Sequence, residues 1–508
     1  MSPSKAKIET VSDILGGWGL WHTNIFVFYF SCLIFSVFDK LSMPFFAPPI
    51  DYWCSKPLIY KNTTDLCSAD CEVWTYDKSF WITTVIDKWD LVCGRSWLAS
   101  FAQSCFMGGV ILGAVIFARL SDDYGRLTVL RIAMPLEIVA ALGLALSPSI
   151  QIFIFFKFIQ GIGSNGRALT GYLLLLECVG TNERGFISVA VDTGFAFGYI
   201  ILPVVYYFLR DFQTFSYFHA FLELFWVIWL FKIPESIRWQ LTHNQIDQAE
   251  SEMIRASEMN KSSITNVKEK FALLKKHIDL QTKTQLEEKK AGFLDLWRSK
   301  VLQRFSLVLY FSYFVNAFVY YGLSLNIGDL NGNLFINFFL AGLVEFPSYI
   351  ITSFALKHIG RKTLLIYFMN GSGLSCLSTV FFLSPTDTTV RVCLAMIGKF
   401  CVTSSFTLCY VYASEIYPTI LRQTGLASCS IAARFGCIIA PFVKELTAFT
   451  SIGVSLSIFG SLSIINAALV VLLPETRGLE MPSDIAEAEK ILTQNVPKRP
   501  ESGDIHVA

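Results

Sequence analysis

The stretch DYGRLTVL, residues 123–130, decides the fold, because a close copy of it, HIGRKTLL, stands at residues 358–365. Each copy follows a long apolar run and contains a Gly-Arg pair. Glycine lets the chain reverse within a tight turn, and arginine can pair with carboxylates or with the carboxyl ends of neighbouring helices. The two copies therefore predict equivalent turns in two repeated halves.

Two further pairs of motifs occur in the same order along both halves. ECVGTNER (177–184) and EIYPTILR (415–422) each contain Glu, then six residues, then Arg. IPESIRW (233–239) is matched by LPETRGL (473–479). The three matched pairs predict two six-helix repeats, and parallel repeats of this kind are the layout of major facilitator transporters.

The composition indicates a membrane protein. Of the 508 residues, 53% are hydrophobic and 16% are charged, whereas soluble domains are about 25% charged. The net charge of +1 argues against a nucleic-acid partner, which needs a basic face. The six histidines show no His/Cys metal spacing, and no nucleophile–base set or nucleotide motif suggests an enzyme.

Apolar runs predict the transmembrane helices, since a span needs about 20 mostly apolar residues. The fold class is therefore an all-α membrane protein with twelve transmembrane helices in two six-helix bundles. The predicted spans are residues 22–50, 97–120, 127–147, 150–180, 186–208, 214–234, 303–324, 332–357, 362–383, 387–415, 421–446 and 450–474.

Basic residues in the connections indicate the orientation, because cytosolic loops carry an excess of Lys and Arg. The middle segment and the two Gly-Arg turns are basic, so we place them and both termini in the cytosol. The first span would serve as the signal. The expected organisation is a cytosolic N-terminal segment (1–21), an N-terminal bundle (22–234) with an extracellular loop (51–96), a cytosolic loop domain (235–302), a C-terminal bundle (303–474) and a cytosolic tail (475–508).

The extracellular loop contains Cys54, Cys67, Cys71 and Cys93. Disulfides persist outside the cell, so we expect two disulfides, with three pairings open. A glycosylation sequon at Asn62 agrees with this placement.

The residues then resemble a known family, the organic cation, anion and carnitine transporters (solute carrier family 22) of the major facilitator superfamily. TTVIDKWDLVC (83–93) resembles the signature that ends the family's extracellular domain, and LSDDYGR, IPESIRW and SEIYPTILRQTG resemble its cytosolic motifs. Residues 320–349 and 398–419 are most similar to the carnitine and zwitterion branch. The resemblance implies an alternating-access carrier of small organic ions in the plasma membrane.

Two positions depart from the family pattern. Asp122-Asp123 stands where the family has Asp-Arg, which alters that charge cluster. Ser36 stands where the carnitine branch has an Asn that is associated with sodium coupling. No cofactor is expected, and the coupling ion, Na+ or H+, stays open.

Arg434 and Glu345 are charges within predicted spans, where ionisable groups mark transport pathways. The resemblance places Arg434 where anion and carnitine members have Arg and cation members have Asp. A guanidinium can bind a carboxylate bidentately, so Arg434 is expected to hold the carboxylate of a substrate. The alternative is that helix carbonyls or a neighbouring acid satisfy Arg434 in a structural role. Glu345 either balances this charge or takes part in coupling, or it pairs with Lys399 in a structural role.

Tyr320, Tyr321 and Tyr349, with Phe346, form an aromatic-rich set in the seventh and eighth spans. Aromatic rings attract a quaternary ammonium by about 1–2 kcal/mol. We therefore count the three tyrosines as substrate-binding candidates. The alternative is chance, because aromatic residues make up 15% of the chain.

Arg167 and Asp192 lie in the fourth and fifth spans. The simplest prediction is a buried ion pair between them, whose disruption would cost several kcal/mol. The alternative is that Arg167 binds substrate directly and favours anions.

The repeated motifs predict cytosolic charge clusters that hold the halves together when the cavity opens outward. The alternative is that these charges are solvated loop ends. The cluster residues are Asp122, Gly125, Arg126, Glu177, Arg184, Gly360, Arg361, Glu415 and Arg422.

The function predicted first is transport of a carnitine-like zwitterion across the lipid bilayer. Organic anions and organic cations are the alternatives within the same class. A non-transporting receptor with this fold is a hypothesis from another class, favoured by the altered LSDDYGR motif.

Overall fold

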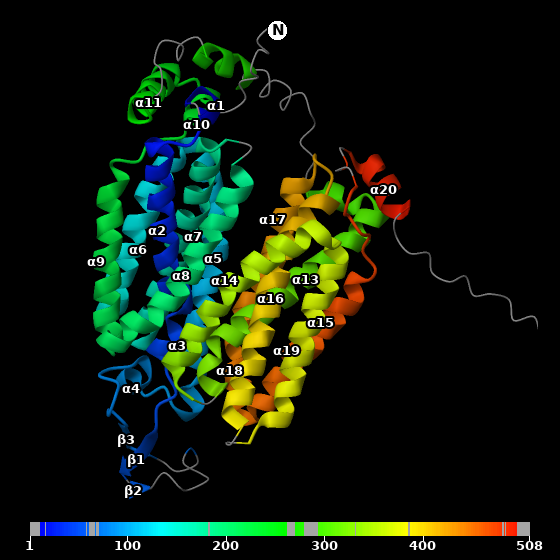
Figure 1. Ribbon diagram of the computed structural model, residues 1–508. Coiled ribbons are helices and arrows are strands. Elements are labelled where there is room, and N and C mark those ends of the chain that lie inside the picture. Colours follow the sequence, from blue (N-terminus) through cyan, green and yellow to red (C-terminus); the bar gives the residue numbers. More distant parts are fainter. Residues whose placement is uncertain are drawn as a thin grey trace, which may run out of the picture. The chain divides into compact units, whose positions relative to one another are not determined.

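The computed structural model describes residues 11–15, 17–56, 58–59, 67, 71–180, 183–261, 270–278, 293–330, 332–384, 387–479, 482 and 484–494. The chain divides into two compact units (Figure 1). The amino-terminal unit comprises Met1–Lys289 and Leu325–Leu343, and the carboxy-terminal unit comprises Lys290–Ser324 and Val344–Ala508. Each unit is described by itself below.

Six long helices form the body of the amino-terminal unit: α2 (Leu20–Leu41), α5 (Trp97–Tyr124), α6 (Arg126–Leu146), α7 (Ile150–Cys178), α8 (Arg184–Leu209) and α9 (Phe212–Leu230). The shorter helices of this unit are α1 (Val11–Leu15), α3 (Met43–Phe46), α4 (Val85–Trp89), η1 (Cys93–Arg95), α10 (Ile237–Thr242), α11 (Ile246–Met259) and η4 (Ile327–Leu330).

Glycines let α5 and α7 approach each other closely. A Cβ at Gly109 of α5 would clash with the backbone of Phe158, and one at Gly161 of α7 would clash with that of Phe106. Small residues at such crossings allow backbones to pack against each other within a membrane. This contact fixes the position of α7, which carries Arg167.

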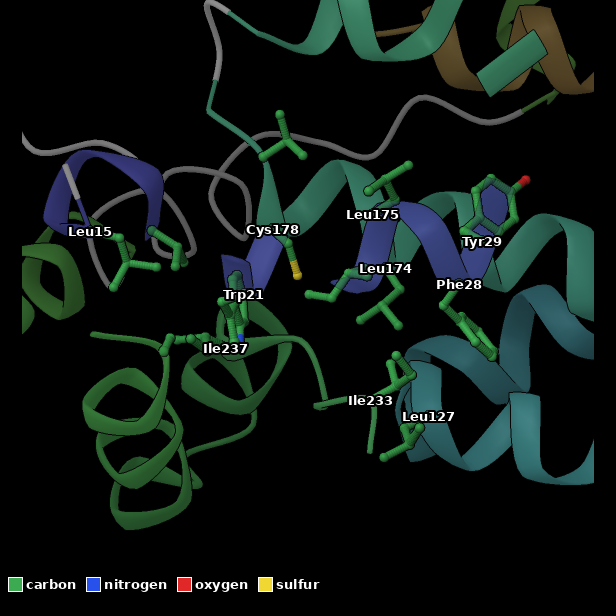
Figure 2. Packing of buried hydrophobic residues seen from close by; sticks show 14 of the residues in the cluster. Leu15, Trp21, Phe28, Tyr29, Leu127, Leu174, Leu175, Cys178, Ile233 and Ile237 are labelled. Carbon is green, nitrogen blue, oxygen red and sulfur yellow. The ribbon is translucent and has the colours of Figure 1, made fainter. Parts of the chain in front are cut away.

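A large apolar cluster joins the ends of α2 and α7 to α1, α10 and α11. Figure 2 shows Trp21, Phe28, Leu174 and Ile237 among the buried side chains of this cluster. The buried side chains of Ala249 and Met253 attach the amphipathic helix α11 to the same cluster. The start of segment 235–302 is therefore packed onto the helix ends.

The loop after α3 contains a small sheet, which the all-α prediction did not include. Its antiparallel strands are β1 (Tyr52–Lys56), β2 (Leu58–Ile59) and β3 (Val73–Tyr76), in the order β2-β1-β3. Disulfides join Cys54 to Cys71 and Cys67 to Cys93. The expectation of two disulfides is confirmed and the pairing is resolved; Asn62 lies outside the described residues.

The carboxy-terminal unit holds most of the second set of six long helices: α13 (Lys300–Leu325), α14 (Leu334–His358), α15 (Arg361–Thr379), α16 (Thr388–Ile416), α17 (Arg422–Ile439) and α19 (Ile452–Val470). The first part of α14 belongs to the amino-terminal unit. The shorter helices are η3 (Phe293–Trp297), η5 (Val380–Phe382), η7 (Ala440–Phe442), α18 (Val443–Phe449) and α20 (Ile485–Gln494).

The long helices match the twelve predicted spans in number and place within the described residues. Ten of them are long and apolar enough to cross a membrane. The other two are α7, with 29 residues, and α9, with 19. Both carry charged side chains that are buried inside the amino-terminal unit.

Candidate functional site

The first Gly-Arg turn is built around an ion pair between Arg126 and Glu177. Nε and Nη2 of Arg126 donate to the two carboxylate oxygens of Glu177, at 3.1 and 2.8 Å. Nη1 of Arg126 donates to the carbonyl oxygen of Ser121, at 2.6 Å. The guanidinium therefore ties the end of α5 and the start of α6 to the end of α7.

The second Gly-Arg turn repeats this geometry in the other unit. Nε of Arg361 donates to both carboxylate oxygens of Glu415, at 3.1 Å each. The hydroxyl of Thr476 donates to Oε2 of Glu415, at 2.6 Å. The internal repeat of the sequence is thus also a repeat of contacts.

A third carboxylate caps the following helix in each turn. Glu235 accepts from the backbone N–H groups of Arg126 and Leu127, at 3.0 and 2.9 Å, and so caps α6. Glu475 accepts from the N–H groups of Arg361 and Thr363, at 2.8 and 3.5 Å, and so caps α15. A carboxylate here satisfies free N–H groups and the positive end of the helix dipole.

Sequence reasoning did not name these two carboxylates as site residues, although both stand in the matched motifs IPESIRW and LPETRGL. Burial raises the pKa of the Glu235 carboxyl, and the N–H groups that it accepts from oppose this rise. The Pro-Glu pair, at the same place in both repeats, was the signal that could have found them.

The two turn glycines are needed for different reasons. Gly125 has φ of +98°, a conformation that side chains rarely adopt, and a Cβ there would also meet the Glu235 carboxylate. Gly360 has φ of −66°, so the expectation of a turn that needs glycine for its backbone is wrong at this position. A Cβ at Gly360 would collide with the Glu475 carboxylate, so this position needs glycine for space.

The other predicted cluster residues lie at the edges of these networks. The exposed carboxylate of Asp122 lies 3.3 Å from Nη2 of Arg126. Nη2 of Arg422 donates to Thr419 at 3.2 Å, and the side chain of Arg184 lies outside the described part of the structure. Glu177 and Glu415 therefore bind the Gly-Arg arginines of their own units.

Arg434 lies on α17 and is partly buried. The side chains that act on it electrostatically are Tyr321, Tyr410 and Cys437. Among the described residues, no carboxylate lies within ion-pair distance of its guanidinium. Arg434 therefore offers a positive charge that the described chain does not neutralise.

Glu345 forms a buried network with the tyrosines of the predicted set. Its Oε1 accepts from Oη of Tyr320 at 2.6 Å and lies 3.4 Å from Nζ of Lys399, and its Oε2 accepts from Oη of Tyr349 at 3.4 Å. Lys399 also donates to Ser324 at 2.5 Å. The structure thus forms the Glu345–Lys399 pair that was one of the two expectations for Glu345.

Tyr321 connects the Glu345 network to Arg434, because both charges act on its hydroxyl. Its ring centroid lies 5.3 Å from that of Tyr320. The structure therefore brings together five of the six substrate-binding candidates in the carboxy-terminal unit, and leaves Arg167 in the other unit.

Arg167 does not form the simple pair with Asp192 that the sequence predicted. Its Nε donates to both oxygens of Glu137 at 3.0 Å, and its Nη2 lies 3.0 Å from Asp39 and 3.5 Å from Glu223. The prediction was wrong because the guanidinium faces α2, α6 and α9, each of which supplies an acid. Three carboxylates share this arginine.

One group of side chains in the described residues has the composition and spacing of a metal site. Ligand-type atoms of Asp39, His219 and Glu223 lie within 4.8 Å of one another, and all three residues are buried. Sequence reasoning missed this group, because Asp39 is far along the chain from His219 and Glu223, and His219 lies in no recognised motif.

Comparison with known proteins agrees with this architecture. Residues 96–441 match the model of the Major Facilitator Superfamily. The chain is 33% identical over 442 residues to an organic cation transporter protein of Drosophila melanogaster, covering 86% of this chain and 79% of the relative. It is 32% identical over 421 residues to organic anion transporter 3 of Sus scrofa, covering 80% and 76%.

A third relative is solute carrier family 22 member 4 of Mus musculus, 30% identical over 423 residues and covering 82% of this chain and 74% of the relative. Among solved structures, the inward-open xylose transporter XylE from E. coli matches with a TM-score of 0.63 at 17% identity, covering 95% of this chain and 99% of that chain. The structural likeness concerns the fold alone.

Proposed function

The chain belongs to the major facilitator superfamily and, within it, to the solute carrier 22 family of organic ion transporters, and we propose which ion it carries. The proposed substrate is a small organic ion with a carboxylate, which Arg434 binds. The protein is a multi-pass membrane transporter of small organic ions and not an enzyme. The proposal concerns which of these ions it carries.

The observation that supports the proposal is the unpaired charge of Arg434. An arginine in the middle of a span costs roughly 3 kcal/mol to insert, and the described chain offers this guanidinium no carboxylate in return. A substrate carboxylate would supply one through two parallel hydrogen bonds. Tyr321 and Tyr410 would lie beside the bound group.

The charge balance around Glu345 favours an anion over a cation. Lys399 neutralises Glu345, and two tyrosine hydroxyls occupy its oxygens. Glu345, Lys399 and Arg434 together carry one net positive charge when ionised. An organic cation that binds at Glu345 would have to displace Lys399 from this carboxylate.

A carnitine-like zwitterion is the second candidate, and the aromatic rings favour it. Tyr321 lies beside Tyr320, and Tyr410 lies 5.6 Å, centroid to centroid, from Phe406. The ring of Tyr320 already has Nζ of Lys399 at 3.2 Å from its centroid. A substrate ammonium would therefore rely on Tyr321 and Tyr410, which makes the zwitterion second to the anion.

We also place the protein in the plasma membrane, with both termini in the cytosol. The disulfides of the loop after α3 support this, since disulfides persist on the extracellular side. The Gly-Arg turns then lie in the cytosol, in agreement with their basic residues. That these charge networks control opening of the carrier stays a prediction.

Uptake by cells that express the protein tests the substrate class. The panel holds a labelled aromatic monocarboxylate, L-carnitine and tetraethylammonium, with vector-only cells as the control. We expect saturable uptake of the monocarboxylate and weaker uptake of L-carnitine. Uptake of tetraethylammonium alone would overturn the proposal.

A further inference from the structure

A buried charge cluster in the amino-terminal unit takes no part in the site proposed above. Its side chains come from α2, α6, α7 and α9. The members are Asp39, Glu137, Lys157, Gln160, Ser164, Arg167, His219 and Glu223, and each is at least nine-tenths buried. So many buried charges are expensive in a membrane protein and mark a function by default.

Most of the acidic oxygens in the cluster are satisfied. Both oxygens of Glu137 accept from Arg167. Asp39 accepts from Gln160 at 2.7 Å, from Ser164 at 3.1 Å and from Arg167 at 3.0 Å. The oxygens of these two carboxylates therefore already have hydrogen-bond donors.

Glu223 differs from them. Both of its oxygens are buried and accept no hydrogen bond, and Nε2 of His219 is buried without a hydrogen-bond partner as well. Nε2 of His219 lies 3.6 Å from Oε1 of Glu223, one turn along α9. Nη2 of Arg167 lies 3.5 Å from Oε1 of Glu223 as an ion pair without a hydrogen bond, so both groups are orphaned with respect to hydrogen bonds only. They face each other across a gap slightly longer than a hydrogen bond.

A single proton would complete this arrangement. Protonated on both nitrogens, His219 would point Nε2–H at Glu223 and Nδ1–H at Asp39, whose Oδ1 lies 3.6 Å from Nδ1. Alternatively the Nε2–H bond breaks as an O–H bond forms on Glu223, which leaves a neutral acid hydrogen-bonded to a neutral imidazole. Either form satisfies both orphaned groups.

The charge count supports one proton. If His219 is neutral and Asp39, Glu137 and Glu223 are all ionised, three carboxylates oppose the cations Arg167 and Lys157, and the cluster carries one net negative charge. Two other titratable groups are close to members of the cluster. The Cys32 thiol of α2 interacts electrostatically with Arg167 and Glu223, and Asp192 of α8 interacts electrostatically with Tyr29. One added proton makes the cluster neutral, and a neutral cluster suits a buried site.

The geometry fits a proton better than a metal ion. The nitrogens of His219 face different carboxylates, and a metal would bind one nitrogen and leave the other facing an acid. Sodium prefers several oxygen ligands, as hard cations do, whereas the oxygens of Asp39 already accept from three side chains.

We propose that the His219–Glu223 pair binds one exchangeable proton and that this proton is the coupling ion of transport. The coupling role rests on the proposed function, whereas proton binding does not. The test therefore has one arm that needs no substrate and one that does.

The first arm measures the thermal unfolding midpoint of the purified full-length protein in detergent between about pH 5 and 8, the range in which histidine titrates. The folded state with a proton site takes up more protons than the unfolded chain, so the midpoint should fall as the pH rises. H219Q and E223Q should each remove a large part of this dependence. H22Q is the comparison variant: His22 is buried in the same unit and forms no ion pair among the described residues, so its replacement should not weaken this dependence.

The second arm uses proteoliposomes and a labelled aromatic monocarboxylate. An inward proton gradient should raise wild-type accumulation several-fold, whereas H219Q and E223Q should reach only the level without a gradient. Exchange of substrate across the membrane at equal pH should survive in both variants, which a merely structural role would not allow. H22Q should respond to the gradient as the wild type does.

The possible results separate the two proposals. If H219Q and E223Q keep the wild-type dependence of the midpoint on pH, the proton site is overturned. If a sodium gradient drives uptake and a proton gradient does not, the coupling role is overturned. If the wild type carries no carboxylate but its midpoint responds as expected, the proposed substrate fails while the proton site stands.

Discussion

Nζ of Lys399 lies 3.4 Å from Oε1 of Glu345, and both side chains are buried within the carboxy-terminal unit. A buried ion pair contributes little net stability, but removing one partner leaves an uncompensated charge. The pair therefore constrains both the folding of this unit and the charge that a substrate meets. Lys399 neutralises the charge of Glu345, so Arg434 carries the net charge of these three side chains.

The first prediction concerns this pair. E345Q and K399M should each destabilise the protein by about 3–5 kcal/mol, because each leaves a buried charge alone, and the double variant should recover much of the loss. Thermal unfolding midpoints of all four proteins form a double-mutant cycle. Single variants as stable as the wild type would show that the pair is not desolvated.

The second prediction concerns Arg167. R167Q should lower the yield of folded protein severely, since three buried carboxylates lose their shared cation. D192N should cost much less, because Asp192 is not one of those three acids. Size-exclusion profiles and unfolding midpoints measure both effects. Equal losses for the two variants would restore the simple Arg167–Asp192 pair that the sequence suggested.

The fold was predictable because its signals are local or periodic. Runs of about 20 apolar residues locate each helix directly, and the repeated Gly-Arg turns identify the two halves without any knowledge of contacts. The four loop cysteines could be predicted to form disulfides from their residue type and their location in the loop. Their pairing was not predictable, because it depends on how β1 and β3 lie together.

The partners of buried charges were not predictable, because they depend on which helix faces meet. Arg167 was recognised as a costly charge, but its acids stand at positions 39, 137 and 223, on three different helices. His219 gave no signal, since a lone histidine in an apolar helix is ordinary. The sequence predicted the Glu345–Lys399 ion pair only as one of two alternatives for Glu345.

The third prediction compares the turn glycines. G125A should destabilise the protein more than G360A, because Gly125 combines a positive φ with a nearby carboxylate and Gly360 has only the carboxylate. A strained backbone of this kind costs about 1–3 kcal/mol. Unfolding midpoints of the two alanine variants measure the difference. A G360A variant that is the less stable of the two would contradict this explanation.

The fourth prediction concerns pH and Glu235. Burial raises the pKa of this carboxyl in the folded protein, so the protonated form is favoured. Its stabilising contribution is full below the unfolded value, about 4.3, and is lost as the pH rises through the folded value. The midpoint difference, E235Q minus wild type, should therefore become more positive as the pH rises above about 4, because the glutamine side chain of this variant carries no charge to bury.

Midpoints measured at closely spaced pH values test this, with E475Q as the matched control from the other repeat. If the E235Q midpoint minus the wild-type midpoint becomes smaller as the pH rises, the explanation is wrong. The hydrogen bonds from the N–H groups of α6 would then stabilise the Glu235 carboxylate by more than its burial costs.

The central claim is that Arg434 binds the carboxylate of the substrate, and the most direct measurement is uptake of a labelled aromatic monocarboxylate by R434A and R434K, normalised to protein at the cell surface. A charged hydrogen bond contributes about 1.5–3 kcal/mol, so R434A should lose about 10- to 100-fold in uptake efficiency. R434K should keep part of the uptake efficiency, because lysine retains the positive charge but lacks the planar guanidinium group that binds a carboxylate through two hydrogen bonds. Wild-type uptake by R434A, at equal surface expression, would contradict the account.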